Sequence, residues 1–321
     1  AVVGHDIRLT GPELANAVAD GLRDGGCTVY DIGECGTEMV YYATAHLNTD
    51  GGIMVTASHN PADYNGMKLV RSGARPVSSD TGLMDIGRMA TEEGEFPHVV
   101  VAGKERGKLI KKDIMPDYIE HLLSYIDVKN LKPLKIVANP GNGGAGPVLA
   151  KLAEHLPFEF IKINETPDGS FPNGVPNPLL EHNRAVTADK VVAEKADLGI
   201  AWDGDFDRCF FFDEKGEFIG GCITLGVKSA VESLASSTAK LPNVEIVQTK
   251  SAICRSTVKN IQSGIYYSVI GQVKEITRRI KKEMKYPEVK VIATGGLSEV
   301  FVEECDIDIV DRGLSLEGLN I

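Results

Sequence analysis

The sequence has 321 residues, enough for two or three domains that each have their own core. It contains 34 Lys and Arg against 45 Asp and Glu, which gives a formal net charge of -11. This charge argues against nonspecific binding to nucleic acid, although a locally positive site can still attract an anionic substrate.

The cysteines are scattered along the chain and form neither a CxxC pair nor a Cys/His cluster: Cys27, Cys35, Cys209, Cys222, Cys254 and Cys305. This pattern argues against a zinc site and favours a reducing cytoplasm, where cysteines act as small core residues. No apolar run reaches the length of a membrane span, and no signal peptide is visible. We therefore expect a cytoplasmic protein without a membrane partner.

The first part of the chain alternates predicted strands and helices. Val2 lies in what reads as a strand already under way, so we expect a natural N-terminal segment to precede it. Apolar spacing and glycine stops then predict a helix from Gly11, a strand over 27–32, a helix over 37–48 and a strand over 51–55. This rhythm predicts a largely parallel, helix-covered sheet with its sites on loops at the strand ends.

A second alternating unit follows residues 96–113, whose charged composition suits a connector. Helices are predicted over 115–126 and 187–195 and after the glycine-rich turn 139–146, and strands over 135–138, 158–163, 198–201 and 209–212. Glu214–Gly216 then predicts a hairpin turn.

The pattern changes from about Gly220. Helices are predicted over 223–236 and 257–285, and strands over 243–248 and 289–293. The basic end of the long helix is interpreted as a solvated face rather than a nucleic-acid site.

Two loops carry residues suited to chemistry, and the first is the serine loop, TASHNP at 56–61. Ser58 beside His59, on a polar loop after a buried strand, could act as a nucleophile. The sequence lacks the GxSxG elbow of hydrolases, and a capped turn is the competing interpretation.

The second is the metal loop, DGDFDR at 203–208. Three carboxylates this close repel one another unless a cation neutralises them, and oxygen ligands favour Mg²⁺. An EF-hand would need glycine at its sixth position, where Arg208 stands. A phosphatase-type aspartate nucleophile would normally follow an N-terminal strand, whereas this loop lies in the middle of the chain.

The two loops complement each other chemically. A serine can carry a phosphoryl group if its charge is neutralised, and a divalent cation can do that while polarising the phosphorus. Lys68 and Arg208 would add positive charge for the transferring oxygens.

These motifs resemble those of the α-D-phosphohexomutase family, particularly its bacterial phosphomannomutase branch. The resemblance covers roughly 1–219 and rests on TASHNP at 56–61, YNGMK at 64–68, NPGNG at 139–143, PDGSFPN at 167–173, PNPL at 176–179 and DGDFDR at 203–208. It implies phosphoryl transfer between O1 and O6 of a hexose phosphate, with a hexose 1,6-bisphosphate as activator.

The resemblance also implies roles for individual residues. Ser58 would be the phosphorylated serine, and Asp203, Asp205 and Asp207 would hold Mg²⁺ together with it. His59, Lys68 and Arg208 would complete the catalytic set, while Arg8, Asn60, Lys68 and Arg208 would lie on the substrate side. The family's Tyr-Asp-x-Arg-Gly segment, Gly-Glu-Met-Ser sugar loop and Arg-Thr-Ser-Asn-Thr phosphate clamp have no counterpart in this sequence.

The last third, roughly 216–321, resembles the C-terminal part of a type III pantothenate kinase, of the actin-like acetate-kinase superfamily. The resemblance rests on FIGG at 218–221, AKLPNVE at 239–245, Thr257 with QSGIYY at 262–267, VIATGGL at 291–297 and LSLEGL at 314–319. It implies Thr257 and Gly264 on a pantothenate side, Gly295 and Gly296 on a nucleotide side, and a homodimer. The kinase's N-terminal phosphate loop is absent.

The predicted fold is therefore α/β, with two consecutive phosphohexomutase-type domains (1–112 and 113–217) and an actin-like half-domain (218–321). The leading functional hypothesis is a Mg²⁺-dependent phosphohexomutase site that acts on a small sugar phosphate. The alternatives are a pantothenate-kinase-like module that binds ATP or pantothenate, and a chimera of the two without turnover.

Overall fold

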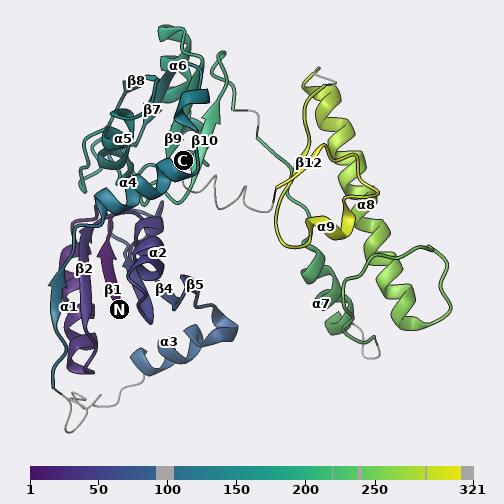
Figure 1. Cartoon of the computed structure of the whole chain (residues 1–321), viewed down its shortest axis with the longest axis horizontal. Helices are drawn as coiled ribbons and strands as arrows, with labels where there is room; N and C mark the ends of the chain where they lie inside the picture. The colour runs from purple at the N-terminus through teal and green to yellow at the C-terminus, as the bar shows by residue number, and fades with distance from the viewer. Residues whose placement is uncertain (92–104, 219, 238–240, 286–287, 312–321) are drawn as a thin grey trace. The chain divides into compact units, whose positions relative to one another are not determined.

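The computed structural model describes residues 1–91, 105–218, 220–237, 241–285 and 288–311. It divides into two compact units, 1–219 and 220–321 (Figure 1). None of the described helices is both long enough and apolar enough to cross a membrane.

The first sheet of unit 1 has parallel strands at its centre. The order is β5 (Arg75–Pro76), β4 (Met67–Arg71), β3 (Gly51–Val55), β1 (Val2–His5), β2 (Val29–Glu34) and β6 (Leu109–Lys111). Strands β3, β1, β2 and β6 run parallel, whereas β4 and β5 extend the β3 edge as antiparallel strands. The predicted largely parallel sheet is confirmed.

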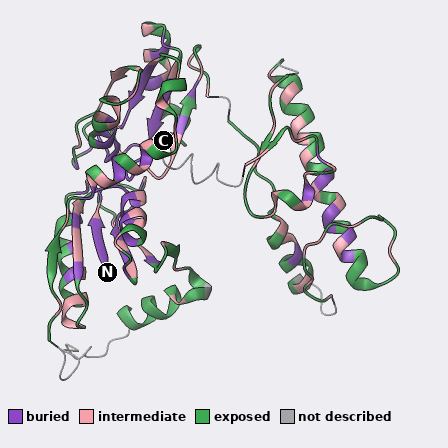
Figure 2. Ribbon diagram, viewed as in Figure 1, coloured by how far each residue is buried: buried purple, intermediate pink, exposed green. Residues whose placement is uncertain are grey.

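Helices cover both faces of this sheet. Helix α1 (Gly11–Asp24), which has a proline in its first turn, packs Ala15 and Ala19 against one face. Helices α2 (Thr37–His46) and α4 (Met115–Ser124) form the core on the other face, where Met54 and Tyr118 are among the buried side chains. Figure 2 shows the buried residues along the strands and the inner sides of these helices.

The second sheet has the order β10 (Cys209–Phe212), β9 (Leu198–Trp202), β7 (Lys135–Asn139) and β8 (Glu159–Lys162). Strands β8, β7 and β9 are parallel and β10 is antiparallel. Helix α5 (Ala145–Ala153) packs on one face and α6 (Ala185–Glu194) on the other. At Glu214–Gly216 the predicted turn is present, since the Gly216 N–H donates to the Asp213 carbonyl, but no strand follows it in the described residues to complete the predicted hairpin.

Unit 2 is built around one long helix, α8 (Thr257–Glu283), whose predicted range is confirmed. Helix α7 (Val227–Ser237) and the short α9 (Ser298–Phe301) pack against it, and β11 (Ile292–Ala293) pairs in parallel with β12 (Ile309–Val310). Its two apolar clusters contain residues of this unit only.

Two sequence-based expectations are wrong. No strand forms over 243–248; Val244 and Ile246 pack as irregular chain against the helices, because no neighbouring strand is placed to pair with them in the described residues. Part of the expected connector, 109–111, is instead the edge strand β6. The rest of that connector includes 92–104, which lie outside the described residues, as does the motif at 314–319.

Candidate active site

The site lies where the carboxyl ends of parallel strands from both sheets meet. The serine loop follows β3, Arg8 follows β1 and the start of α2 follows β2. The metal loop follows β9 of the second sheet. In open α/β sheets this edge is where loops gather into binding sites, and here two such edges contribute to one cluster.

Ser58 is held in an unusual backbone conformation at the centre of this cluster. Its φ of 51° lies in the left-handed region, which non-glycine residues adopt rarely and mostly where the surrounding contacts enforce it. Its N–H donates to Thr56 Oγ1 at 2.9 Å, and its hydroxyl donates to Asp203 Oδ2 at 2.7 Å. The two loops that the sequence placed 145 residues apart therefore meet through the serine hydroxyl.

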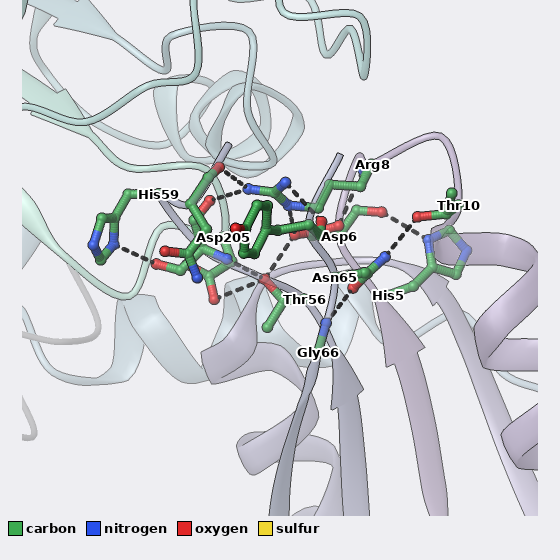
Figure 3. A network of polar contacts seen from close by, with 12 residues as sticks. His5, Asp6, Arg8, Thr10, Thr56, His59, Asn65, Gly66 and Asp205 are labelled. Atoms are coloured by element: carbon green, nitrogen blue, oxygen red, sulfur yellow. Dashed lines mark hydrogen bonds and ion pairs between the residues drawn. The ribbon is translucent and has the colours of Figure 1, made fainter. Parts of the chain in front are cut away.

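Arg8 enforces the shape of the serine loop. Its Nη1 donates to the carbonyls of Pro61 and Tyr64, and its Nη2 donates to those of Ser58 and Asn60, at 2.6 to 2.9 Å. Its Nε lies 3.3 Å from Asp6 Oδ2, and the side chain is completely buried (Figure 3). The guanidinium of Arg8 is thus enclosed by the loop that it holds, and the substrate contact expected for Arg8 stays a prediction.

The three carboxylates of the metal loop converge. One oxygen from each of Asp203, Asp205 and Asp207 lies within 4.8 Å of the others. The Lys68 ammonium, on β4, donates to Asp205 Oδ2 and Asp207 Oδ2 at 2.6 Å each. Lys68 is thus placed against the metal loop, where its charge offsets part of the carboxylate repulsion.

Burial and these contacts set the protonation of the aspartates. Burial, and secondarily the neighbouring Asp205, raises the pKa of Asp203 to about 7. For Asp205, burial also acts to raise the pKa, but the Lys68 charge and hydrogen bond outweigh it and the pKa is lowered. Asp205 is therefore charged at neutral pH although its side chain is buried.

Arg208 and His59, both partly exposed, contact the hydroxyl of the buried Ser58. Arg208 Nη2 donates to Ser58 Oγ and to Asp203 Oδ2, and it contacts His59 Nδ1 at 2.6 Å. Burial, then the Arg208 charge, lowers the pKa of His59, so its ring is neutral at neutral pH. The Asn60 side chain is exposed, and its carbonyl is one of those held by Arg8.

The donor set fits a hard divalent cation. Asp205 Oδ1 is buried and has no hydrogen-bond partner among the residues that the structure describes, which is costly for a charged oxygen unless a cation binds it. Together with Asp203, Asp207 and Ser58 Oγ, it forms an all-oxygen set of the kind that Mg²⁺ prefers.

The structure adds residues that sequence reasoning did not assign. Thr37 Oγ1 donates to Asp205 Oδ2 at 2.7 Å, and its N–H donates to the Asp205 carbonyl at 3.2 Å. Thr56 Oγ1 contacts Asp6 Oδ2 at 2.6 Å and Asp205 Oδ2 at 3.1 Å (Figure 3). Their positions in the sequence could have identified these two threonines as site residues. Thr56 directly follows β3, and Thr37 begins α2.

The four predicted kinase-like residues lie in unit 2. Thr257 begins α8 and Gly264 lies within it, both exposed. Gly295 and Gly296 are exposed in the turn after β11, where the Gly295 carbonyl accepts from the Ser298 N–H and hydroxyl. These contacts are those of a helix start.

Sequence models of known families match the chain in consecutive segments. Phosphoglucomutase/phosphomannomutase alpha/beta/alpha domain I matches 1–95, and domain II of the same family matches 116–216. The type III pantothenate kinase model matches 209–279. Residues 209–216, which include β10, are therefore matched by both families.

Individual relatives agree with the first two matches. A phosphomannomutase of Salmonella montevideo is 57% identical over 231 residues, covering 70% of this chain and 50% of the relative. A protein of Xanthomonas campestris pv. campestris described as phosphohexose mutases is 55% identical over 226 residues, covering 70% and 49%. The chain thus spans about half the length of the curated relatives it matches.

Solved structures give the same result. A phosphoglucomutase/phosphomannomutase family protein from Burkholderia thailandensis has a TM-score of 0.59 at 27% identity, covering 98% of this chain and 58% of that one. A putative phosphomannomutase from Thermus thermophilus has a TM-score of 0.59 at 26% identity, covering 74% and 52%. By its sequence matches, its two α/β sheets and its paired serine and aspartate loops, the chain belongs over residues 1–216 to the phosphoglucomutase/phosphomannomutase family, whose domains I and II it carries.

Proposed function

We propose that Ser58 carries a phosphoryl group and exchanges it with O1 or O6 of a hexose phosphate, with Mg²⁺ at the aspartates of the metal loop. The observation that carries this proposal is the contact between the two loops. Ser58 Oγ lies 2.7 Å from Asp203 Oδ2, beside the unpartnered Asp205 Oδ1. A nucleophile and a set of cation ligands in contact are what phosphoryl transfer requires.

The transfer makes one bond and breaks one. Ser58 Oγ bonds to the phosphorus of a hexose bisphosphate as the bond between that phosphorus and the sugar oxygen breaks. The proton lost by Ser58 is taken up by the leaving sugar oxygen, and the reverse step returns it. A bound divalent cation would supply charge neutralisation and polarisation at the phosphorus.

The residues around Ser58 have separate tasks in this proposal. Arg208, already donating to Ser58 Oγ, would face the transferring oxygens, and Lys68 would hold the carboxylates of Asp205 and Asp207 in place through its two hydrogen bonds. His59, whose neutral ring lies 3.3 Å from Ser58 Oγ, is a proton acceptor within reach. Asn60 would support the loop through its carbonyl, and Arg8 would position the loop without touching substrate.

The wider activity follows the relatives, which are described as phosphomannomutases and phosphohexose mutases. We propose a hexose 1,6-bisphosphate as the phosphoryl donor that activates Ser58, and cytoplasmic sugar-phosphate metabolism as the setting. Domains 1–112, 113–217 and 218–321, and a homodimer through the last of them, stay predictions. The alternative of a pantothenate or ATP site is less favoured, because the phosphomannomutase relatives match 70% of this chain, whereas the pantothenate kinase model matches 209–279.

A single-turnover experiment tests the proposal. The chain is mixed with an excess of hexose 1,6-bisphosphate, with Mg²⁺ or with EDTA, and released hexose monophosphate is measured. We expect one burst equal to the protein concentration with Mg²⁺, and none with EDTA or in Ser58→Ala. A burst that persists in Ser58→Ala, or no burst in the wild-type chain with Mg²⁺, would overturn the proposal.

A further inference from the structure

Phe206, in the middle of the metal loop, has no assigned role, yet it is the residue between two of the three carboxylates. Its φ of 45° lies in the left-handed region, where a bulky side chain is a genuine outlier. Such a conformation persists only where the surroundings enforce it. The ring is half-buried. It packs against the apolar cluster beneath α2 and α4 in the first sheet and against the cluster beneath α5 in the second sheet.

The ring packs against two glycines, each of which directly precedes a helix. A Cβ on Gly36, which precedes α2, would collide with the Phe206 ring around Cζ. A Cβ on Gly144, which precedes α5, would lie 3.2 Å from Cδ1 and Cε1 of the same ring. Neither glycine has a positive φ, so neither is required by backbone conformation. Their lack of a side chain is explained by the ring that fills the space.

The backbone of the metal loop is held at the same two places. The Thr37 N–H, next to Gly36, donates to the Asp205 carbonyl at 3.2 Å, and the Gly144 N–H donates to the Gly204 carbonyl at 3.1 Å. The first turn of a helix has N–H groups without partners inside the helix, and here two helices give theirs to one loop. Ring packing and hydrogen bonds therefore fix the loop to both sheets at once.

We infer that Phe206 is a positioning residue: its ring, seated against Gly36 and Gly144, sets the place of the metal loop relative to the serine loop. It contacts no reacting atom and acts through the carboxylates on either side of it. The role in catalysis rests on the proposed function, whereas the seating of the loop does not. A displacement of about 1 Å between reacting groups can cost about 100-fold in rate, so this seating bears directly on transfer.

Hydrogen exchange of the full chain tests the seating without metal or substrate. In Phe206→Ala, the amides of Thr37 and Gly144 should exchange at least about tenfold faster, because their acceptors lose their fixed place. The Ile163 amide, which donates to the Ala138 carbonyl in the second sheet, should be unchanged. Phe211→Ala, which removes a ring that is 45% exposed on β10, is the matched control and should leave all three amides unchanged.

A double-mutant cycle adds the functional readout. Gly36→Ala alone should weaken Mg²⁺ binding by about tenfold or more, because its methyl group meets the ring. In the Phe206→Ala background the same change should weaken it by no more than about twofold. The inference would be overturned if Phe206→Ala left exchange at the Thr37 and Gly144 amides unchanged, or raised exchange at Ile163 equally. It would also be overturned if Gly36→Ala and Phe206→Ala had additive effects on Mg²⁺ binding. A wild-type chain that is not phosphorylated on Ser58 would instead contradict the proposed function, and the exchange result would still decide the seating.

Discussion

A single buried guanidinium, that of Arg8, holds the serine loop in the conformation that presents Ser58. Four backbone carbonyls of the loop accept hydrogen bonds from it, and Asp6 balances its charge. A lysine has one nitrogen and cannot reach all of these acceptors, so buried carbonyls would lose their partners. We expect Arg8→Lys to lower the free energy of unfolding by about 3 kcal/mol.

Urea unfolding followed by fluorescence of Trp202 measures this change, since the chain has one tryptophan and it is buried beside the metal loop. The control is Arg106→Lys, which alters an exposed pair with Asp20 and Asp24 and should change stability by less than about 0.5 kcal/mol. Equal effects of the two substitutions would contradict the role given to Arg8.

Glu38 gives the site a pH dependence at the residue scale. Burial, and then the charge of Asp207, raises the pKa of Glu38 from its ordinary 4.5 to about 7. The folded state thus holds the proton more tightly than the unfolded state, so stability is lost as the pH rises from about 4.5 to about 7. Glu38→Gln removes this loss, and its gain in stability over the wild type should grow across that window in metal-free buffer. A difference that is constant with pH would refute this explanation.

At the scale of elements, close packing of β3 against α2 places the serine loop. Gly52 lies on β3 where a Cβ would collide with Thr44 Oγ1 and lie 3.1 Å from Val40. We expect Gly52→Ala to lower the free energy of unfolding by about 2 kcal/mol, because a well-packed core has no room for a methyl group.

The matched control for Gly52 is Gly21→Ala in α1. Among the residues that the structure describes, a Cβ at Gly21 meets nothing within 4 Å, so helix propensity alone should raise stability by about 0.5–1 kcal/mol. Both variants are compared by urea unfolding. A loss of stability in both, or in neither, would show that the fit between β3 and α2 does not limit this site.

The helices and strands of unit 1 whose apolar residues repeat with the period of helix or strand could be predicted from sequence, whereas the strands β4, β5 and β6 were missed. The strand that leads to Ser58 and the one that leads to Asp203 were both placed correctly for this reason. The contacts of Arg8 and the ring of Phe206 could not be predicted, since they depend on which loops meet after folding. The prediction of a strand over 243–248 was wrong. Val244 and Ile246 have the alternating spacing of a strand, but strand formation also needs a pairing partner.

At the scale of the whole molecule, the chain has two units whose cores share no residue. Tyr266, completely buried on α8, stacks on Phe301 at 5.6 Å between ring centroids. We expect Tyr266→Ala to lower the free energy of unfolding of unit 2 by about 3–5 kcal/mol, by analogy with other aromatic truncations. Helical circular dichroism should report this shift, while the Trp202 transition and Mg²⁺ binding stay unchanged. A parallel shift of the Trp202 transition would contradict the separation of the two cores.

The central claim is that Ser58 and the metal loop form one phosphoryl-transfer site, and peptide mapping by mass spectrometry tests it most directly. The wild-type chain and Asp205→Asn are each incubated with hexose 1,6-bisphosphate and Mg²⁺, digested and sequenced. We predict phosphate on the wild-type peptide at Ser58, and its near-complete loss in Asp205→Asn, because the substitution removes a charged carboxylate whose buried Oδ1 has no hydrogen-bond partner among the described residues. Phosphate on another residue, or equal phosphate on Ser58 in both chains, would contradict the account.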